Sequence, residues 1–62
     1  MLKIFSVKFE VNQALIEAET CAEALNYSFR EWGRSRGPYN VTEATEDDIA
    51  WVKGMAGMVH QA

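Results

Sequence analysis

Hydrophobic and polar residues alternate along residues 2–11, and this alternation predicts a first β-strand. A strand with one buried face shows a period of two, because successive side chains point to opposite faces. Leu2 and Ile4 interrupt the polar pattern on the outer face, so we expect another part of the chain to cover that corner. The residues expected on the inner face are Phe5, Val7, Phe9 and Val11.

The following residues predict a tight turn and a second strand. Residues 11–14 favour the turn, although Asn-Gln is a weaker hairpin signal than Asn-Gly. In the strand at residues 15–19, Ile16 and Ala18 should point inward between outward glutamates. Leu15 is an apolar exception on the outward side, and we expect it to join the apolar corner of the first strand.

The helix expected at residues 21–32 is the element around which the other elements can be arranged. Thr20 is a favoured N-cap residue, and Glu23 lies three residues later, so the pair forms a capping box. Gly33 can end the helix with a positive φ. The apolar stripe of the helix consists of Ala22, Leu25, Phe29 and Trp32.

A loop, a third strand and a second helix should follow. Residues 33–38 have a loop composition, and residues 39–44 predict a strand with Tyr39 and Val41 on one face. Thr45 should cap the second helix, whose first turn holds three acids. Its stripe combines Ile49, Val52, Ala56 and Val59 with Trp51, Met55 and Met58.

The second helix should end between two glycines. Gly54 and Gly57 each cost about 1 kcal/mol relative to alanine inside a helix, so we expect the helix to fray or stop there. Residues 58–62 can then form a short strand or an ordered tail.

The order strand, strand, helix, strand, helix predicts a single α+β domain over residues 1–62. The expected sheet is antiparallel and three-stranded, with the order 2-1-3 and the first helix on one face. An alternative places the third strand parallel to the second through a right-handed crossover. The second helix can cover the outer apolar corner, extend the face of the first helix, or exchange with another subunit.

Length and composition narrow the functional classes. A chain of 62 residues with 48% hydrophobic residues is globular, but it buries only about 60% of its unfolded surface. One cysteine excludes an internal disulfide, and one cysteine with one histidine is too few for structural zinc. We therefore expect no cofactor and no metal. We expect the domain to be stabilised by homo-oligomerisation or by docking on a partner.

The charge and hydropathy of the chain indicate where in the cell the protein is located and whether it binds nucleic acid. The net charge of −3 is unfavourable for a general nucleic-acid binder, which usually has a basic surface. Residues 1–6 lack the apolar region of a signal peptide, and no apolar run approaches the roughly 20 residues of a membrane span. The sequence therefore predicts a cytoplasmic protein without membrane contact.

Two single residues could carry chemistry, but each has a simpler interpretation. His60 has no neighbouring nucleophile in the sequence and lies close to the C-terminus, so we expect a solvated tail residue. Cys21 begins a helix, where the helix dipole can activate a thiol. We interpret it as a small buried residue at the junction of helix and sheet. Without a catalytic constellation we expect no enzyme activity.

Two charged clusters could instead bind a partner. Acids gather around the start of the second helix, where they suit the helix dipole and could also meet a basic protein surface. Arginines follow the first helix beside an aromatic residue and could contact phosphates. The first candidate surface comprises Glu43, Glu46, Asp47, Asp48, Trp51 and Met55. The second comprises Arg30, Arg34, Arg36 and Tyr39.

Residues 16–24 contain a strand that ends in Glu-Ala-Glu, then a capped turn and a helix rich in alanine. This segment resembles an element of small phage and mobile-element proteins, including anti-CRISPR proteins of the type I inhibitor class. Residues 39–53 resemble the second half of such phage proteins. The resemblance implies a phage or prophage origin and identifies no binding residue.

Together these observations predict a non-enzymatic module that docks on a host protein or complex, including a defence complex, and modulates or inhibits it. The alternative is a small dimeric nucleic-acid-binding regulator that uses the arginine loop. A self-assembling structural module is a third interpretation.

Overall fold

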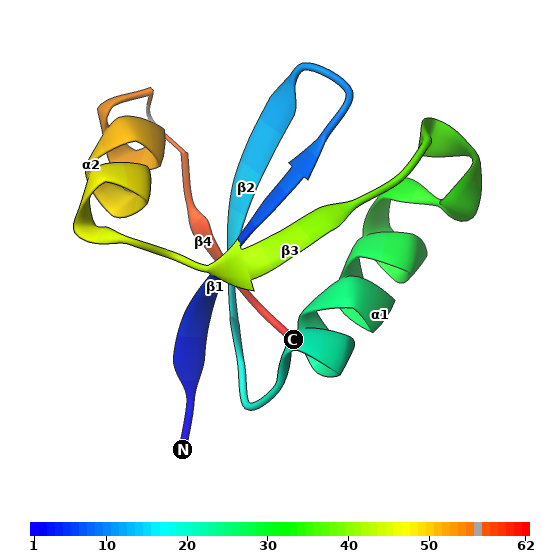
Figure 1. Cartoon of the computed structure of the whole chain (residues 1–62), viewed down its shortest axis with the longest axis horizontal. Helices are drawn as coiled ribbons and strands as arrows, with labels where there is room; N and C mark the ends of the chain where they lie inside the picture. Colours follow the sequence, from blue (N-terminus) through cyan, green and yellow to red (C-terminus); the bar gives the residue numbers. More distant parts are fainter. Residues whose placement is uncertain (56) are drawn as a thin grey trace.

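The computed structural model describes residues 1–55 and 57–62, which form a mixed four-stranded sheet with two α-helices (Figure 1). The strand order is β3-β1-β2-β4. β1 is antiparallel to β2 and to β3, whereas β4 is parallel to β2. The elements are β1 (Lys3–Phe9), β2 (Asn12–Ala18), α1 (Cys21–Trp32), a 3₁₀ turn η1 (Arg34–Arg36), β3 (Asn40–Glu43), α2 (Glu46–Gly54) and β4 (Val59–Gln61).

This topology confirms the α+β class and extends the expected sheet. β1 lies between β2 and β3 as predicted. Because β2 and β3 are both antiparallel to β1, the third strand does run parallel to the second, as in the alternative arrangement, but the two strands are not paired with each other. The expected antiparallel three-stranded sheet is incomplete, because β4 adds a fourth, parallel strand beside β2. Three residues are too short a run to show a strand period, which is why the sequence left this segment open between strand and tail.

The β1–β2 turn lies earlier in the chain than expected. Phe9 pairs with Asn12, so Glu10 and Val11 alone form the loop. Glu10 adopts a φ of +53°, the left-handed conformation that tight two-residue hairpins require. Val11 is fully exposed, and its expected place on the inner face is wrong.

The main core lies between the sheet and α1. Register and pleat place Phe5, Val7 and Phe9 of β1 on the same face as Ile16 and Ala18 of β2. All five side chains are buried, and they pack with Ala24 of α1.

The packed face of α1 is rotated from the predicted stripe. Ala24 and Ser28 are the buried residues of the helix, whereas Ala22 is exposed and Trp32 is only partly buried. Leu25 and Phe29 are partly buried as well. Small side chains let the helix backbone approach the sheet closely. The Ser28 hydroxyl remains satisfied because it donates to the carbonyl oxygen of Ala24 at 3.0 Å.

Both ends of α1 follow the sequence signals closely. The N–H of Glu23 donates to the Thr20 hydroxyl at 3.2 Å, as the capping box predicts. The Glu23 carboxylate accepts from the N–H of Glu19 rather than from that of Thr20. Gly33 has a φ of +86°, and its N–H donates to the carbonyl of Phe29 at 2.9 Å.

α2 covers the opposite face of the sheet (Figure 1). Ser6 and Leu15 lie across from each other on that face, and both are fully buried. Val52 of α2 is buried there as well. Of the three alternatives for this helix, coverage of the outer apolar patch is therefore correct at Leu15, although Leu2 stays 57% exposed.

A polar contact fixes α2 on the sheet. Nε2 of Gln13 donates to the Ser6 hydroxyl at 2.8 Å and to Oδ1 of Asp48 at 3.2 Å. The helix ends at Gly54, as expected, and Val59 belongs to β4 rather than to the helical stripe. Ala56, which the sequence places on that stripe, lies outside the described residues.

Candidate binding surfaces

The start of α2 is built from a reciprocal capping box. The N–H of Asp48 donates to the Thr45 hydroxyl at 3.1 Å, and Oδ2 of Asp48 accepts from the N–H of Thr45 at 3.0 Å. This backbone hydrogen bond, together with the one from Gln13, lowers the pKa of Asp48. Asp48 therefore positions the helix, and its carboxylate is directed toward Thr45 and Gln13 rather than outward.

The predicted acidic cluster is divided by the fold. Glu43 lies on β3, where its carboxylate is 3.7 Å from Nζ of Lys3. Glu46 and Asp47 are exposed in the first turn of α2. The structure therefore leaves these two acids of the four as the outward-facing negative charges at the start of the helix.

The outward stripe of α2 carries an acid, followed along the chain by an aromatic residue and a methionine. Asp47, Trp51 and Met55 follow one another at intervals of four residues, the spacing that places side chains on one helix face. Trp51 is 58% exposed and Met55 is 69% exposed, whereas the neighbouring Val52 is buried. The prediction that Trp51, Met55 and Met58 widen the packed face is wrong, because all three side chains are exposed. We refer to Glu46, Asp47, Trp51 and Met55 as the α2 surface.

The arginines at the other end of the molecule lie over aromatic rings. The guanidinium carbon of Arg34 is 4.9 Å from the ring centre of Phe29. Arg36 lies 5.5 Å from the ring of Phe9, and Arg30 lies 5.8 Å from that of Tyr27. These are cation–π distances, so the fold uses the arginines to cover aromatic surface.

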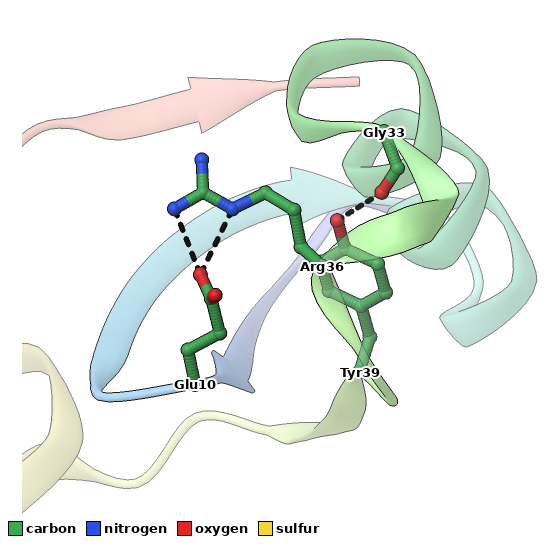
Figure 2. Close-up of polar contacts among 4 residues, drawn as sticks. All are labelled: Glu10, Gly33, Arg36 and Tyr39. Atoms are coloured by element: carbon green, nitrogen blue, oxygen red, sulfur yellow. Dashed lines mark hydrogen bonds and ion pairs between the residues drawn. The ribbon is translucent and has the colours of Figure 1, made fainter.

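Two members of the predicted phosphate site have partners within the chain (Figure 2). Nε and Nη2 of Arg36 lie 2.9 and 2.8 Å from the same carboxylate oxygen of Glu10. The Tyr39 hydroxyl donates to the carbonyl of Gly33, and its ring packs against Phe9. The ring of Tyr39 is thus part of the core edge rather than a free stacking platform.

Sequence reasoning missed an aromatic cluster centred on His60. Nδ1 of His60 is 2.9 Å from the Tyr27 hydroxyl, and the imidazole meets Trp32 edge-on at 5.4 Å between ring centres. The expectation of a solvated tail residue is wrong, because β4 holds His60 on the α1 face beside Ile16. Burial raises the pKa of Tyr27, and the nearby Glu31 carboxylate raises it further. The only sequence signal was a single apolar position, Val59, next to the histidine.

Two open hollows meet at Arg36 and Phe9. One has a volume of about 340 Å³ and is bordered by Phe9, Asn12, Gln13, Ala14, Trp32, Arg36 and His60. The other has a volume of about 400 Å³ and is bordered by Lys8, Phe9, Glu10, Arg36, Gly37, Pro38 and Asn40. Both belong to the hairpin end of the sheet.

Cys21 is exposed, so its expected burial is wrong, although it does lie where α1 meets the sheet. Its sulfur lies 3.7 Å from the carbonyl oxygen of Val41 in β3.

Within residues 1–55 and 57–62, no three His, Cys, Asp or Glu side chains gather where they could hold a metal ion. No helix in the described part of the chain is long and apolar enough to cross a membrane. Comparisons with known protein families, with curated proteins and with solved structures found no match to this chain.

Proposed function

We propose that this chain is a non-enzymatic binding module, encoded by a phage or prophage, that docks on a host protein or complex through the α2 surface and modulates or inhibits it. The observation that carries the proposal is the outward stripe of α2. An exposed tryptophan and an exposed methionine follow an acid that makes no ion pair within residues 1–55 and 57–62.

The chemistry of this surface indicates the kind of partner. Tryptophan is enriched among residues that dominate binding energy, and methionine adapts to irregular apolar surfaces. Glu46 and Asp47 add negative charge at one end of the stripe, which favours a partner whose apolar patch lies beside basic residues. The phage origin rests on the resemblance of residues 16–24 and 39–53 to small phage proteins.

The test is capture of the partner with variants that alter only this surface. Tagged protein expressed in the host should retain a stoichiometric protein partner, identified by mass spectrometry. Trp51→Ala combined with Asp47→Lys should lower its recovery at least tenfold. Asp48 is left unchanged, because its carboxylate caps the helix and its reversal would unfold the surface.

Glu31→Lys supplies the matched control, because Glu31 is an exposed acid on α1, away from α2. Loss of the partner only from the α2 variant supports the proposal. Equal loss of the partner from both variants would show that only the overall charge of the protein matters. Unchanged recovery of the partner with the α2 variant would exclude the α2 surface as the binding site.

Self-association is a second use of the same exposed residues. A homo-oligomer would bury Trp51 and Met55 against another copy, as expected for a small domain with a single cysteine. Light scattering of the purified chain over a range of concentrations distinguishes the cases. If the chain forms an oligomer through these residues, Trp51→Ala should lower its mass to that of the monomer. If the wild-type chain is a monomer at all concentrations, a host partner is the protein that binds the α2 surface.

The alternative function is a dimeric nucleic-acid-binding regulator. Arg30 and Arg34 favour it, because both are exposed beside the end of α1. Arg36 and Tyr39 favour it less, since both have partners within the chain. Binding to DNA or RNA that weakens steeply with added salt would support this alternative. No binding at low salt would remove it.

A further inference from the structure

We propose that a second copy of this chain pairs with the free edge of β3, so that two four-stranded sheets join into one sheet of eight strands. We call the outward side of residues Asn40–Glu43 the β3 edge. It consists of main-chain groups of β3 and includes none of the four residues of the α2 surface. The inference therefore does not depend on the proposed function.

The β3 edge is open in the structure. β3 is the first strand in the order β3-β1-β2-β4, so no strand of the described residues pairs with its outer side. In Figure 1, β3 crosses in front of β1 and β2, with α1 and α2 on either side of it. The register between β3 and β1 is continuous over four residue pairs, without the bulge that often protects a sheet edge.

The register identifies the main-chain groups that point outward. In an antiparallel pair, residues that exchange hydrogen bonds with the neighbouring strand alternate with residues whose groups point away from it. The N–H of Ala44 donates to the carbonyl of Ile4 at 2.9 Å, and Thr42, two residues earlier, belongs to the same set. Val41 and Glu43 belong to the other set, so their N–H and C=O groups point away from β1.

One of these groups has a weak side-chain contact. The carbonyl oxygen of Val41 is 3.7 Å from the sulfur of Cys21, which lies on α1 and not on β1. A thiol is a weak donor and a carbonyl oxygen has two lone pairs, so this oxygen can still accept a main-chain hydrogen bond. The β3 edge therefore offers two N–H donors and two carbonyl acceptors.

The four groups are self-complementary. A two-fold axis at Thr42 places Val41 of each copy opposite Glu43 of the other, and the two residues of each such pair exchange two hydrogen bonds. Thr42 then lies opposite the same residue of the second copy, a cross-strand pair that is favourable in antiparallel sheets. Nζ of Lys3 is 3.7 Å from the Glu43 carboxylate, which reduces the repulsion between the glutamates of the two copies.

The shape of the chain favours a copy of itself on this side. Its Cα extents are 28 × 28 × 15 Å, and Figure 1 is viewed along the shortest of them, so β3 lies on a broad side of a flat molecule. Pairing two such sides doubles the thin dimension and brings it close to the other two. A chain of 62 residues with one cysteine also gains more from a second copy than a larger domain does, because it buries less of its own surface.

The first experiment combines light scattering over a dilution series with amide hydrogen exchange followed by ¹H–¹⁵N NMR. We expect a dimer with a Kd of about 100 µM or tighter. The amides of Val41 and Glu43 should exchange at least about threefold more slowly at a concentration well above the Kd than at one well below it. Thr42 is an internal control, because its N–H faces β1 in the monomer as well as in the dimer.

Glu43→Pro tests the main chain directly. Proline has no N–H and is tolerated on an edge strand where the nitrogen faces solvent, so the variant should fold and remain a monomer at every concentration. Glu43→Ala is the matched control, because it removes the same carboxylate and keeps the N–H. We expect its Kd to stay within about threefold of that of the wild type, since the lost ion pair with Lys3 is exposed.

Thr42→Lys provides a second test if Glu43→Pro does not fold. Thr42 is exposed, and the two-fold axis would place the two lysines opposite each other. Their repulsion should weaken the dimer about tenfold, and added salt should restore part of the affinity. Trp51→Ala should leave the Kd unchanged, because Trp51 belongs to the α2 surface.

Several results would overturn the proposal. A monomer at all concentrations would show that the β3 edge stays free. A dimer that protects amides of β4 instead, or one that Trp51→Ala abolishes, would place the contact elsewhere. Equal Kd values for Glu43→Pro and Glu43→Ala, with both variants folded, would mean that the main-chain N–H of residue 43 takes no part.

Discussion

The Tyr27 hydroxyl and Nδ1 of His60 lie 2.9 Å apart, and this hydrogen bond joins α1 to β4. It connects residues that are 33 positions apart in the chain. It also closes the α1 face of the sheet at the edge where β4 is only three residues long.

Tyr27→Phe should therefore destabilise the protein and loosen β4 first. Loss of one hydrogen bond costs about 1 kcal/mol, and His60 then loses its partner. Urea unfolding gives the change in the free energy of unfolding, and hydrogen exchange locates it among the β4 amides. A double-mutant cycle with His60→Phe isolates the pair. If the two substitutions are additive, the hydrogen bond contributes nothing measurable.

The same tyrosine predicts a loss of stability in alkali. Its pKa is raised in the folded state, so the folded protein holds this proton more tightly than the unfolded chain does. The contribution is fully present below the unfolded pKa of about 10 and is lost as the pH rises through the folded pKa. Wild type should thus lose more stability above about pH 10 than Tyr27→Phe does. Parallel pH profiles would contradict this assignment.

Asp48 predicts the reverse dependence in acid. Its pKa is lowered by the bonds from Thr45 and Gln13, so its contribution is present above the unfolded pKa of about 4 and is lost as the pH falls through the folded value. Asp48→Asn should lower stability at pH 7, and the difference from wild type should shrink below about pH 4. Chemical unfolding at several pH values measures this. Asp47→Asn is the control, because Asp47 is exposed and not part of the cap.

The two glycines after Trp51 should respond in opposite ways to alanine. A Cβ on Gly57 would lie 2.5 Å from Cγ1 of Val52 and 2.8 Å from its carbonyl oxygen, so Gly57→Ala should be destabilising. A Cβ on Gly54 meets nothing within 4 Å, and Gly54→Ala should stabilise α2 by roughly 0.5–1 kcal/mol. Thermal unfolding of both variants gives the comparison. A stabilised Gly57→Ala would mean that the chain does not pass this close to Val52.

Substitutions at two adjacent residues of α2 should differ sharply in their effect on the free energy of unfolding. Val52 is 4% exposed, and Val52→Ala should cost about 2 kcal/mol through lost burial and a cavity. Trp51→Ala should cost less than Val52→Ala, because the tryptophan side chain is 58% exposed and leaves no buried cavity. Urea unfolding of the two variants checks the orientation of the helix. A larger loss for Trp51→Ala would place the tryptophan in the core.

Local signals in the sequence predicted local structure well. Thr20, Thr45 and Gly33 define helix ends through contacts with residues three or four positions away, so a short window of sequence contains the whole interaction. The alternation from Phe5 to Phe9 likewise identified the central strand. These elements were sufficient for the α+β class and for the place of β1 between β2 and β3.

Features that depend on distant contacts could not be read in this way. The position of His60 depends on β4 pairing with β2, and the sequence of residues 59–61 does not predict that pairing. The rotation of α1 onto Ala24 and Ser28 depends on how closely the helix approaches the sheet, which a hydrophobic stripe does not encode. Among the candidate site residues, the exposure of Trp51 depends on which side of α2 packs on the sheet, and the structure buries the neighbouring Val52 instead.

The division of α2 into an inner and an outer side has a consequence for how this protein can change over generations. Val52 and the Asp48 cap hold the helix, whereas Asp47, Trp51 and Met55 are largely exposed. Selection can therefore replace the outward residues one at a time without endangering the fold. A lineage that must follow a changing target would keep the sheet and α1 constant, and would accumulate its differences along a single stripe of one short helix.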